Sequence, residues 1–532
     1  MKIGNVLRQN TGFYKVAVVV FLLAAFSSCK KDKKSDGQAA TPTPTLSATK
    51  AIKTFGFKAD KNPGLINDVV GQIKGDTIYA TAVAGTDLTG LVPEFTFDGD
   101  EVVINSSPQK SETNARDFSK PLTYTVVAAD NSKKDYVVKF LDNGVPALYI
   151  NTAGGAAVTS KDVYVSAILR TVSNFTDSSV MYKLDMKGHG NSTWSDMPKK
   201  PYRLKLSKKV SLFGLPETKN WILLANYADK SLMRNEMAFT VSRDLGRAFT
   251  PASKFIELYL NNVYLGNYQI TQMVKEGTGL VDIEEQTNTS TTLPDLSGGY
   301  LIEQDLFPSG VYFRTTKNMP FVVKYPDDDI IIQQQKDYIK AHFQKAEDAM
   351  FAANFADPVN GYRKYFDVDT YVDYYIVNEV IGNPDVFRST YLFKKRNDDK
   401  IYTGPIWDFD KAADNDNRLG EQVNGLMYTS AFEPKIWIKQ LMLDRTFRQR
   451  IRNRWNEVKP KIMALPNTID PLAAKLAYSQ ARNFVKWDIL KKQSYLELKV
   501  NGSYAGEVQY LKDFLTNHIA WLDIKFNSAD YQ

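Results

Sequence analysis

Cysteine and histidine are almost absent from this sequence. Its 532 residues include one cysteine, Cys29, and three histidines, His189, His342 and His518. A single cysteine cannot form an intramolecular disulfide. A structural zinc site usually needs four Cys or His ligands, so all four of these residues would have to bind the same ion. The composition therefore argues against a disulfide scaffold and against a zinc site of the Cys/His type.

An excess of charge of one sign is also lacking. The formal net charge is +7, and Lys2, Arg8 and Lys15 supply three of these charges before residue 28, which leaves about +4 (7 − 3) for the rest. No long stripe of lysine and arginine accompanies this charge, whereas nucleic-acid-binding proteins usually carry one. We therefore expect no nucleic-acid partner.

Long apolar runs are missing except at the start, where residues 16–26 read VAVVVFLLAAF behind the three basic residues. This pattern predicts that residues 1–28 are a secretory signal peptide, because the run is too short for a mature membrane-spanning helix. The run ends in FSSC, and small residues before a lone cysteine resemble a bacterial lipobox. By that resemblance Cys29 is lipidated and anchors the exported protein to a bacterial membrane; the outer membrane is favoured, on its periplasmic or cell-surface side. The alternative is a buried thiol.

Two segments of different composition follow the leader. Residues 29–49 are charged and then rich in Thr, Pro and Ala, which predicts a disordered tether. Residues 50–143 alternate short β-like runs, such as AIKTFGF and KDYVVKFL, with turn signals such as Asp98-Gly99. This spacing predicts a small all-β sandwich of immunoglobulin-like type, acting as a spacer or binding carbohydrate.

Residues 144–532 begin with strand patterns and end with helical ones, which predicts an α+β domain with a helical C-terminal part. Near its start, a strand over 180–187 leads into GHGNSTW. The glycines and polar side chains of Gly188, Gly190, Asn191 and Ser192 would let backbone N–H groups approach a phosphate, although the same pattern occurs in ordinary tight turns. Lys205, on the returning strand, could reach such a phosphate as a point charge.

Acidic residues end two later segments. Asp385 follows a helix-like run, and Asp408 and Asp410 follow the strand-like KIYTGPIWDFD. Two acidic loops next to neighbouring strands suit Mg²⁺, which takes one or two carboxylates together with substrate phosphates. Two hairpin turns with solvated aspartates would give the same pattern.

Six blocks of the chain together carry a family resemblance. They are GHGNSTW with KKPYRLKL, NYADKSLMRNEMAFTVSRDLG, FIELYLNNVYLGNYQIT, GGYLIEQD, DYYIVNEVIGNPD and YTGPIWDFD. In this order they resemble the spore coat protein H (CotH) kinase-like family over about residues 183–526. The resemblance implies an atypical protein-kinase-like fold that uses ATP with Mg²⁺ or Mn²⁺ to phosphorylate Ser or Thr hydroxyls of a protein substrate.

The resemblance also implies roles for individual residues. Asp385 would orient the attacking hydroxyl, and Asp408 would bind the metal, with Asp410 as a further ligand. Lys205 is the candidate lysine for the phosphates, and Glu236 is its candidate ion-pair partner. A carboxylate at the hydroxyl and a metal on the phosphates are what phosphoryl transfer requires.

The sequence departs from the expected patterns at two positions. Thr390 stands five residues after Asp385, where protein kinases carry asparagine, and Gln272 stands where family members often carry glutamate. The leader and the family resemblance together predict a membrane-anchored atypical protein kinase. Because of the two departures, the alternatives are a kinase-like surface scaffold or adhesin without turnover and a carbohydrate-associated binding lipoprotein.

Overall fold

The computed structural model describes residues 45–65, 68–82, 86–142, 145–173, 176–177 and 180–532. The predicted signal peptide, Cys29 and most of the predicted tether lie outside these residues, so those assignments and the domain boundaries stay predictions. Among the described residues, no helix combines the length and the apolar character needed to cross a bilayer.

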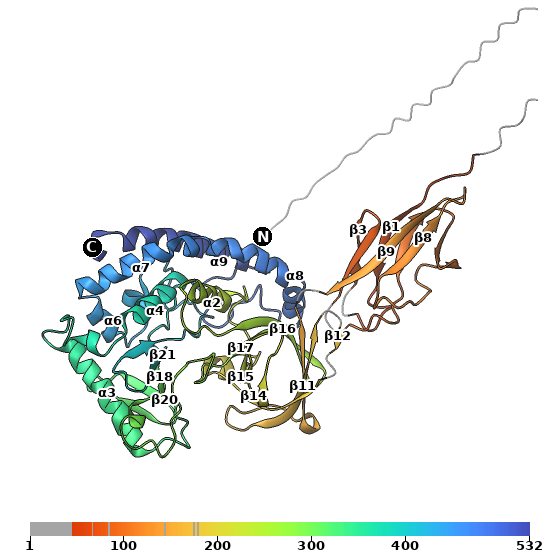
Figure 1. Ribbon diagram of the computed structural model, residues 1–532. Helices are drawn as coiled ribbons and strands as arrows, with labels where there is room; N and C mark the ends of the chain where they lie inside the picture. Colours follow the sequence, from red (N-terminus) through yellow and green to blue (C-terminus); the bar gives the residue numbers. More distant parts are fainter. Residues whose placement is uncertain (1–44, 66–67, 83–85, 143–144, 174–175, 178–179) are drawn as a thin grey trace, which may run out of the picture. The chain divides into compact units, whose positions relative to one another are not determined.

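Strands of the small β part form two sheets. The first has the order β2-β1-β5 and the second the order β3-β4-β9-β8-β6-β7. Figure 1 labels β1 of the first sheet and β3, β9 and β8 of the second. The bounds are β1 Ala51–Phe57, β2 Val69–Val70, β3 Gln72–Lys74, β4 Thr77–Ala82, β5 Glu94–Asp98, β6 Glu101–Ile104, β7 Ser107–Pro108, β8 Leu122–Val127 and β9 Lys133–Asp142.

Aromatic rings from both sheets fill the space between them. Phe55 of β1 meets Tyr124 of β8 edge-on with ring centroids 5.1 Å apart, and Phe57 meets Phe118 at 4.9 Å. Edge-to-face contacts at this distance are favourable beyond the area they bury. One shared core between two sheets is the sandwich that the alternating pattern predicted.

The next part of the chain forms a closed β-barrel. Its strands follow the order β10-β16-β17-β15-β14-β13-β11, and β11 pairs again with β10 to close the ring, while β12 extends from β11. The bounds are β10 Ala147–Thr152, β11 Val165–Ser173, β12 Thr176–Asp177, β13 Tyr182–Gly188, β14 Tyr202–Val210, β15 Thr218–Leu224, β16 Ser253–Leu260 and β17 Val263–Gln272. Alternate side chains, among them Trp221, Leu204 and Leu258, fill the interior, so the barrel is a packed core rather than a channel.

Two asparagines make the hairpin between β16 and β17. Leu260 pairs with Val263, and Asn261 and Asn262 both have positive φ, 51° and 63°. Asparagine tolerates this left-handed conformation better than most residues, and two such residues make the turn whose twist matches a hairpin. Alternating apolar residues on both sides of Asn261-Asn262 predict this hairpin from the sequence, and the structure confirms it.

A second sheet and a set of helices complete the chain. The sheet has the order β19-β20-β18-β21-β22, with bounds β18 Tyr300–Asp305, β19 Tyr312–Arg314, β20 Pro320–Tyr325, β21 Ser389–Lys394 and β22 Ile401–Thr403. The helices are α1 Ser192–Ser195, α2 Arg234–Asp244, α3 Gln333–Phe351, α4 Val368–Ile381, α5 Met427–Ser430, α6 Ile436–Leu441, α7 Arg445–Met463, α8 Ile469–Lys486 and α9 Tyr504–Phe526. Helix α4 packs against α2, α7 and α9, and α8 packs on β17 of the barrel (Figure 1). The predicted α+β class with a helical C-terminal part is confirmed.

Helix α4 has defined signals at both ends. The Asp367 side chain accepts a hydrogen bond from the Thr370 backbone N–H at 2.8 Å, which caps the first turn. At the other end Gly382 adopts φ 63°, and a Cβ there would lie 2.7 Å from the Phe514 ring. Only glycine fits this close approach and left-handed turn, which ends the helix and directs the chain into Asn383-Pro384-Asp385.

A buried ion pair joins the segment before α2 to the segment before α9. Lys230 Nζ lies 2.7 Å from Glu497, and both side chains are almost fully buried. Because the change Glu497→Gln leaves an uncompensated ammonium in the core, we expect it to lower the free energy of unfolding by about 3–5 kcal/mol. Urea denaturation of the full chain measures this loss.

The matched control for this prediction is the exposed pair of Lys492 and Asp488, whose atoms also lie close together, at 2.6 Å. Solvent screens this pair, so Asp488→Asn should change the free energy of unfolding by no more than about 0.5 kcal/mol. Equal losses in the two variants would contradict a special role for the buried pair.

Candidate active site

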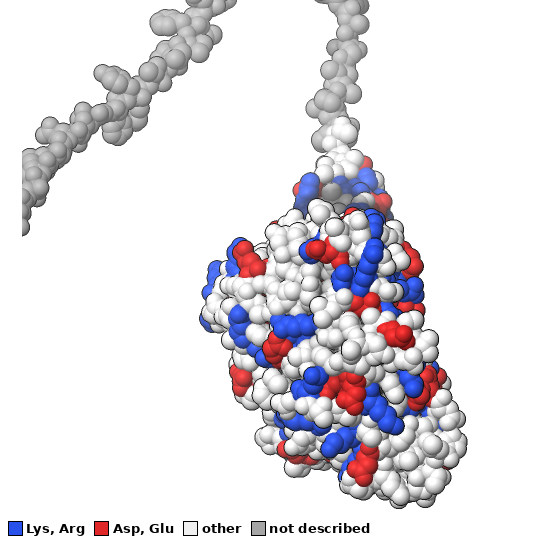
Figure 2. Space-filling model, turned by 90° about the vertical axis from the view of Figure 1, so that its left-hand side faces the viewer, with Lys and Arg blue, Asp and Glu red and all other residues white. Residues whose placement is uncertain are grey.

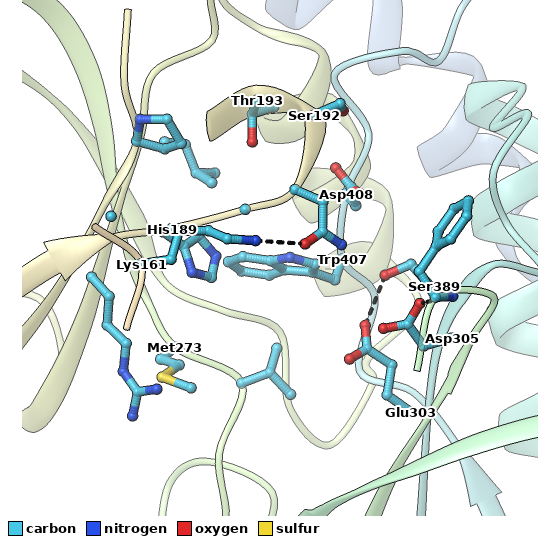
Figure 3. Close-up of a pocket in the computed structure, with 18 of the residues that line it drawn as sticks. Lys161, His189, Ser192, Thr193, Met273, Glu303, Asp305, Ser389, Trp407 and Asp408 are labelled. Atoms are coloured by element: carbon cyan, nitrogen blue, oxygen red, sulfur yellow. Dashed lines mark hydrogen bonds between the residues drawn. The ribbon is translucent and has the colours of Figure 1, made fainter. Parts of the chain in front are cut away.

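A cavity of about 680 Å³ lies outside the barrel and is also bordered by the second sheet. The barrel side supplies Lys187, the loop after β13 and Arg203 of β14. The second sheet supplies Glu303 and Lys324, and the loops after α4 and β22 supply Asp385 and the segment 407–411. Three stretches distant in sequence therefore meet here (Figure 3).

Asp385 enters the cavity directly after α4. The Asn383 side chain accepts a hydrogen bond from the Asp385 backbone N–H at 3.1 Å and donates to the Asp408 carbonyl at 3.4 Å, so one amide links the two acidic loops. Arg418 lies 3.3 Å and Arg388 3.7 Å from the Asp385 carboxylate. Burial raises the pKa of Asp385 in spite of these two arginines.

Asp408 and Asp410 lie on either side of the buried Phe409. Phe409 is fully buried, and its backbone N–H donates to Asn235 Oδ1 at 2.9 Å. Asp408 has a φ of 70°, an uncommon conformation outside glycine, and its side chain reaches solvent within the cavity although protein surrounds it (Figure 3).

Excess negative charge collects at this pair. Burial raises the pKa of Asp408 well above its usual range, and the carboxylates of Asp410, Asp385 and Glu303 raise it further. Burial also raises the pKa of Asp410 to about 6, although Lys411 opposes the shift. Among the described residues no lysine or arginine forms a salt bridge with either aspartate, in contrast to Asp385. A cation between the two carboxylates would relieve this repulsion.

The residues present fit one kind of metal site. Within the described part of the chain, no three His, Cys, Asp or Glu side chains are grouped closely enough to hold a metal by themselves. Mg²⁺ commonly binds through one or two carboxylates and completes its shell with phosphate oxygens and water. The pair of Asp408 and Asp410 therefore suits a metal that arrives with a phosphorylated ligand.

Cations line the barrel side of the same cavity. Lys187 of β13 and Arg203 of β14 are cross-strand partners, and neither forms a salt bridge within the described residues. Burial lowers the pKa of Lys187, and the neighbouring Arg203 lowers it further. Arg203 Nε is buried and lacks a hydrogen-bond partner among the described residues. Lys187 Nζ lies 4.6 Å from the centroid of the Tyr164 ring, so its one described partner is uncharged. Cations that face a cavity without a carboxylate partner favour an anionic ligand.

The glycine-rich loop borders the cavity next to these cations. All four of its predicted residues, Gly188, Gly190, Asn191 and Ser192, line the wall. Gly190 has φ 79°, and a Cβ there would lie 2.1 Å from Thr193 Oγ1, so the loop needs a glycine at this position. Burial and the surrounding cations lower the pKa of His189 to about 3, so its ring is neutral near pH 7.

Lys205 lies outside the cavity. It is exposed on β14, opposite Asp185 and Asn220. Arg203 and Lys205 are two residues apart and share one face of the strand, but only Arg203 is near enough to line the cavity. The structure therefore places arginine rather than the predicted lysine beside the glycine-rich loop.

The predicted ion pair between Lys205 and Glu236 is not formed. Glu236 on α2 lies 2.6 Å from Arg243 and accepts hydrogen bonds from Ser253 Oγ and Gln269 Nε2. These partners hold Glu236 on the side of α2 that faces β16 and β17, away from the exposed face of β14.

Sequence reasoning gave no role to three charged residues of the second sheet. Glu303 forms a salt bridge with Lys324 at 2.8 Å and accepts a hydrogen bond from Ser389 Oγ at 2.9 Å, and Asp305 lies beside them in the cavity (Figure 3). Burial raises the pKa of Asp305. Their place on strands was visible in the sequence, but the strand pairing that brings Asp305 opposite Ser389 was not.

Thr390 does not face the cavity. Its hydroxyl donates to the Val386 carbonyl at the end of the same loop, and the Tyr374 hydroxyl donates to Thr390 Oγ1 at 3.1 Å. Ser389, the preceding residue, faces the cavity instead because side chains alternate along β21. The position that carries asparagine in protein kinases is therefore structural here.

Charges of both signs lie on the face shown in Figure 2, where lysine and arginine side chains are interspersed with aspartate and glutamate.

Comparison with known proteins gives two family matches. The family model described as CotH kinase protein matches residues 186–522, and the model described as SGBP, N-terminal matches residues 56–140. The first match contains Asp385, Asp408 and Asp410 together with the glycine-rich loop of the cavity. No curated protein matches the chain.

One solved structure with a match is a crystal structure provisionally described as a glycoside hydrolase, from Bacteroides thetaiotaomicron VPI-5482. The match has 22% sequence identity and a TM-score of 0.16, and it covers 34% of the present chain and 54% of the other. The chain thus spans about half the length of that protein, and a similarity at this TM-score carries no conclusion about fold or activity.

Proposed function

The chain belongs to the CotH kinase protein family, and on that premise we propose that its cavity transfers the terminal phosphoryl group of ATP to a Ser or Thr hydroxyl of a protein substrate. The observation that carries the proposal is the meeting, in one cavity, of Asp385, Asp408 and Asp410 with cations that have no carboxylate partner among the described residues. Phosphoryl transfer depends mainly on positioning and on neutralising phosphate charge, and these groups are of the types it requires.

In the proposed reaction each end of the cavity has its own task. Lys187 and Arg203 attract the phosphates from the barrel side, while the backbone of the loop from Gly188 to Ser192 approaches them closely. Asp408 and Asp410 would hold Mg²⁺ or Mn²⁺. When bound, the metal supplies charge neutralisation on the phosphate oxygens.

Asp385 acts on the acceptor. Its carboxylate orients the Ser or Thr hydroxyl and accepts the hydroxyl proton as the oxygen attacks. A new bond forms between that oxygen and the terminal phosphorus, the bond from this phosphorus to the bridging oxygen breaks, and ADP leaves with the electron pair of the broken bond. The raised pKa of Asp385 makes it a better proton acceptor than an ordinary aspartate.

The test uses the full chain with γ-³²P-labelled ATP, Mn²⁺ or Mg²⁺, and general acceptor proteins such as casein. We expect label on phosphoserine or phosphothreonine after acid hydrolysis, and no label when EDTA removes the metal. If neither metal-dependent ATP binding nor transfer of label can be detected, the proposal fails.

A second candidate function rests on the small β part. Its match to the SGBP N-terminal model over residues 56–140 favours a surface role in which this part associates with carbohydrate. The two candidates are compatible, since the matched residues do not overlap those of the cavity. Glycan-array binding that persists when Asp408 is replaced would support this second role, and the absence of any glycan binding would remove it.

A further inference from the structure

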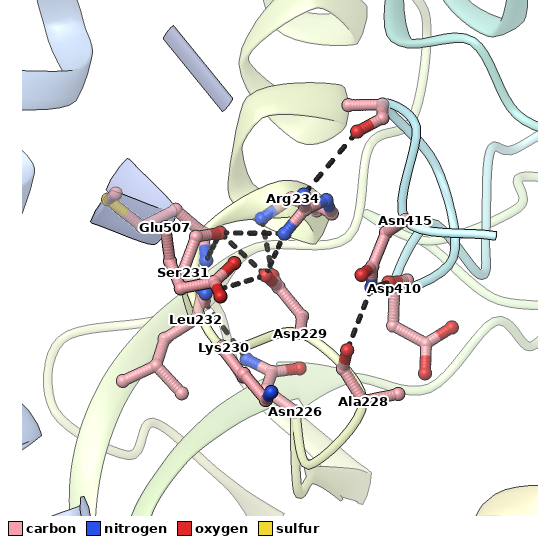
Figure 4. Close-up of polar contacts among 12 residues, drawn as sticks. Asn226, Ala228, Asp229, Lys230, Ser231, Leu232, Arg234, Asp410, Asn415 and Glu507 are labelled. Carbon is pink, nitrogen blue, oxygen red and sulfur yellow. Dashed lines mark hydrogen bonds and ion pairs between the residues drawn. The ribbon is translucent and has the colours of Figure 1, made fainter. Parts of the chain in front are cut away.

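The first residue of α2 reaches the acidic segment that contains the metal candidates. Arg234 is fully buried and donates through Nε to the Ala412 carbonyl at 2.9 Å and through Nη2 to the Ala413 carbonyl at 3.4 Å (Figure 4). Both carbonyls lie just after Asp410. The guanidinium therefore binds the backbone of this segment rather than the carboxylates themselves.

A buried aspartate fixes this arginine. Asp229 Oδ1 lies 2.6 Å from Arg234 Nη1, and Asp229 Oδ2 accepts a hydrogen bond from the Arg234 backbone N–H at 2.8 Å (Figure 4). Both side chains are shielded from solvent. A charge-assisted pair of this kind holds the planar donors of arginine in one orientation.

Two asparagines add to the same contact. Asn235, the next residue of α2, accepts the Phe409 backbone N–H at 2.9 Å. Asn415 donates to the Ala228 carbonyl at 2.8 Å and to the Asp410 carbonyl at 2.7 Å (Figure 4). The segment 408–415 is thus tied to residues 228–235 at its start, middle and end.

This segment needs external support. Asp408, Ala413 and Asp414 all have positive φ, 70°, 52° and 54°, and each such conformation is costly for a residue with a side chain. Mutual repulsion of the Asp408 and Asp410 carboxylates, which share one cavity, adds to the cost. Without the bonds from residues 228–235, the segment would relax and separate Asp408 from Asp410.

We propose that Arg234, together with Asn235, is a positioning residue that holds the backbone of segment 408–415 so that Asp408 and Asp410 converge. This proposal rests on the proposed function, because convergence matters for a metal that binds both carboxylates. It also gives a role to the block NYADKSLMRNE: Asp229, Arg234 and Asn235 act in it, whereas Glu236 binds elsewhere.

The first experiment compares Arg234→Lys with wild type in the full chain by hydrogen exchange and mass spectrometry. Lysine keeps the charge next to Asp229 but cannot reach that carboxylate and two carbonyls at once. We expect amide exchange in peptides covering residues 408–416 to become about tenfold faster, because local opening becomes easier. Unchanged protection of these peptides would overturn the proposal.

A matched control separates positioning from general damage. Arg482 is also buried and lies 3.6 Å from Glu257, but its partners belong to the barrel. Arg482→Lys should leave exchange of residues 408–416 at the wild-type rate. Equal acceleration of these peptides in both variants would show a global effect and would also overturn the proposal.

The second experiment measures Mn²⁺ affinity by calorimetry. Changing groups that orient metal ligands typically weakens binding about 10- to 100-fold, so we expect at least a tenfold rise in the Mn²⁺ dissociation constant of Arg234→Lys. At saturating Mn²⁺, kcat should recover to within about threefold of wild type, because Arg234 does not touch the reacting groups. Wild-type affinity in the variant would contradict the proposal.

A second variant keeps the test decisive if Arg234→Lys does not fold. Asn235→Leu replaces the amide by a side chain of similar volume that cannot accept the hydrogen bond from the Phe409 N–H. We therefore expect faster amide exchange in the peptides covering residues 408–416. If wild type itself binds no Mn²⁺, the proposed function fails, and the exchange results alone then decide whether residues 234–235 hold the segment.

Discussion

Replacing Asp408 with asparagine is expected to reduce phosphate transfer at least about 100-fold while making the metal-free protein more stable. The loss follows from removing a metal ligand. The gain follows because burial raises the pKa of Asp408, and the nearby carboxylates of Asp410, Asp385 and Glu303 raise it further. The neutral amide removes this repulsion at little cost in shape.

The stability gain should depend on pH. Because the pKa of Asp408 is higher in the folded than in the unfolded chain, the folded state binds more protons, and its stability falls as the pH rises above about 4. The amide that replaces this carboxyl in the variant does not titrate. In thermal unfolding with EDTA, the advantage of Asp408→Asn in Tm should be small near pH 4 and grow to a few degrees by pH 8.

The control for this prediction is Asp329→Asn. Asp329 is exposed and does not line the cavity, so the same chemical change there should alter neither transfer nor the pH dependence of Tm. Added Mn²⁺ should raise the Tm of wild type but not of Asp408→Asn. A variant that keeps wild-type transfer would remove Asp408 from the metal site.

Replacing Asp385 with asparagine is expected to lower kcat about 1,000-fold with little change in the binding of ATP and Mn²⁺, because general-base contributions fall between about 10² and 10⁴. Asp385 is held by Arg418 and Arg388 and lies on a different loop from Asp408. The two variants should therefore differ: one loses metal binding, and the other loses only turnover.

A pH–rate profile distinguishes this role from a structural one. The raised pKa of Asp385 means that wild-type turnover should increase with pH until this carboxyl has lost its proton. The residual rate of Asp385→Asn should not show this increase with pH. Asp369→Asn, at an exposed position in the first turn of α4, serves as control and should keep the wild-type profile. A weakened affinity for ATP in Asp385→Asn would contradict the assignment to the acceptor.

The elements that sequence patterns specify locally could be predicted well. Asn261-Asn262 predict a hairpin through their tolerance of positive φ, and the helix-like run predicted before Asp385 is α4. The acidic loops and the glycine-rich loop were also predicted to share a site, and the structure brings Asp385, Asp408, Gly188 and Gly190 to one cavity. Their chemical roles stay predictions.

Features that depend on distant contacts could not be predicted. Arg203 and Lys205 face the same side of β14, and only the position of the cavity along the strand distinguishes them. Glu303 and Asp305 read as ordinary strand residues until β18 pairs with β21. Arg234 has no assigned role in the sequence analysis, because its partners Ala412 and Ala413 are far away in the chain.

The closed barrel has a consequence for the order of folding. Its closing strand β10 pairs in parallel with β16, so that Leu148 lies opposite Leu258, and the ring is complete only when β17 has paired as well. Pairing across so long a loop is slow, because the entropy of loop closure is lost before the contacts form. The local hairpin of β16 and β17 can form first and then capture β10. The ring to which Lys187 and Arg203 belong can therefore close only after the chain up to Gln272 is available, although their own strands β13 and β14 pair locally.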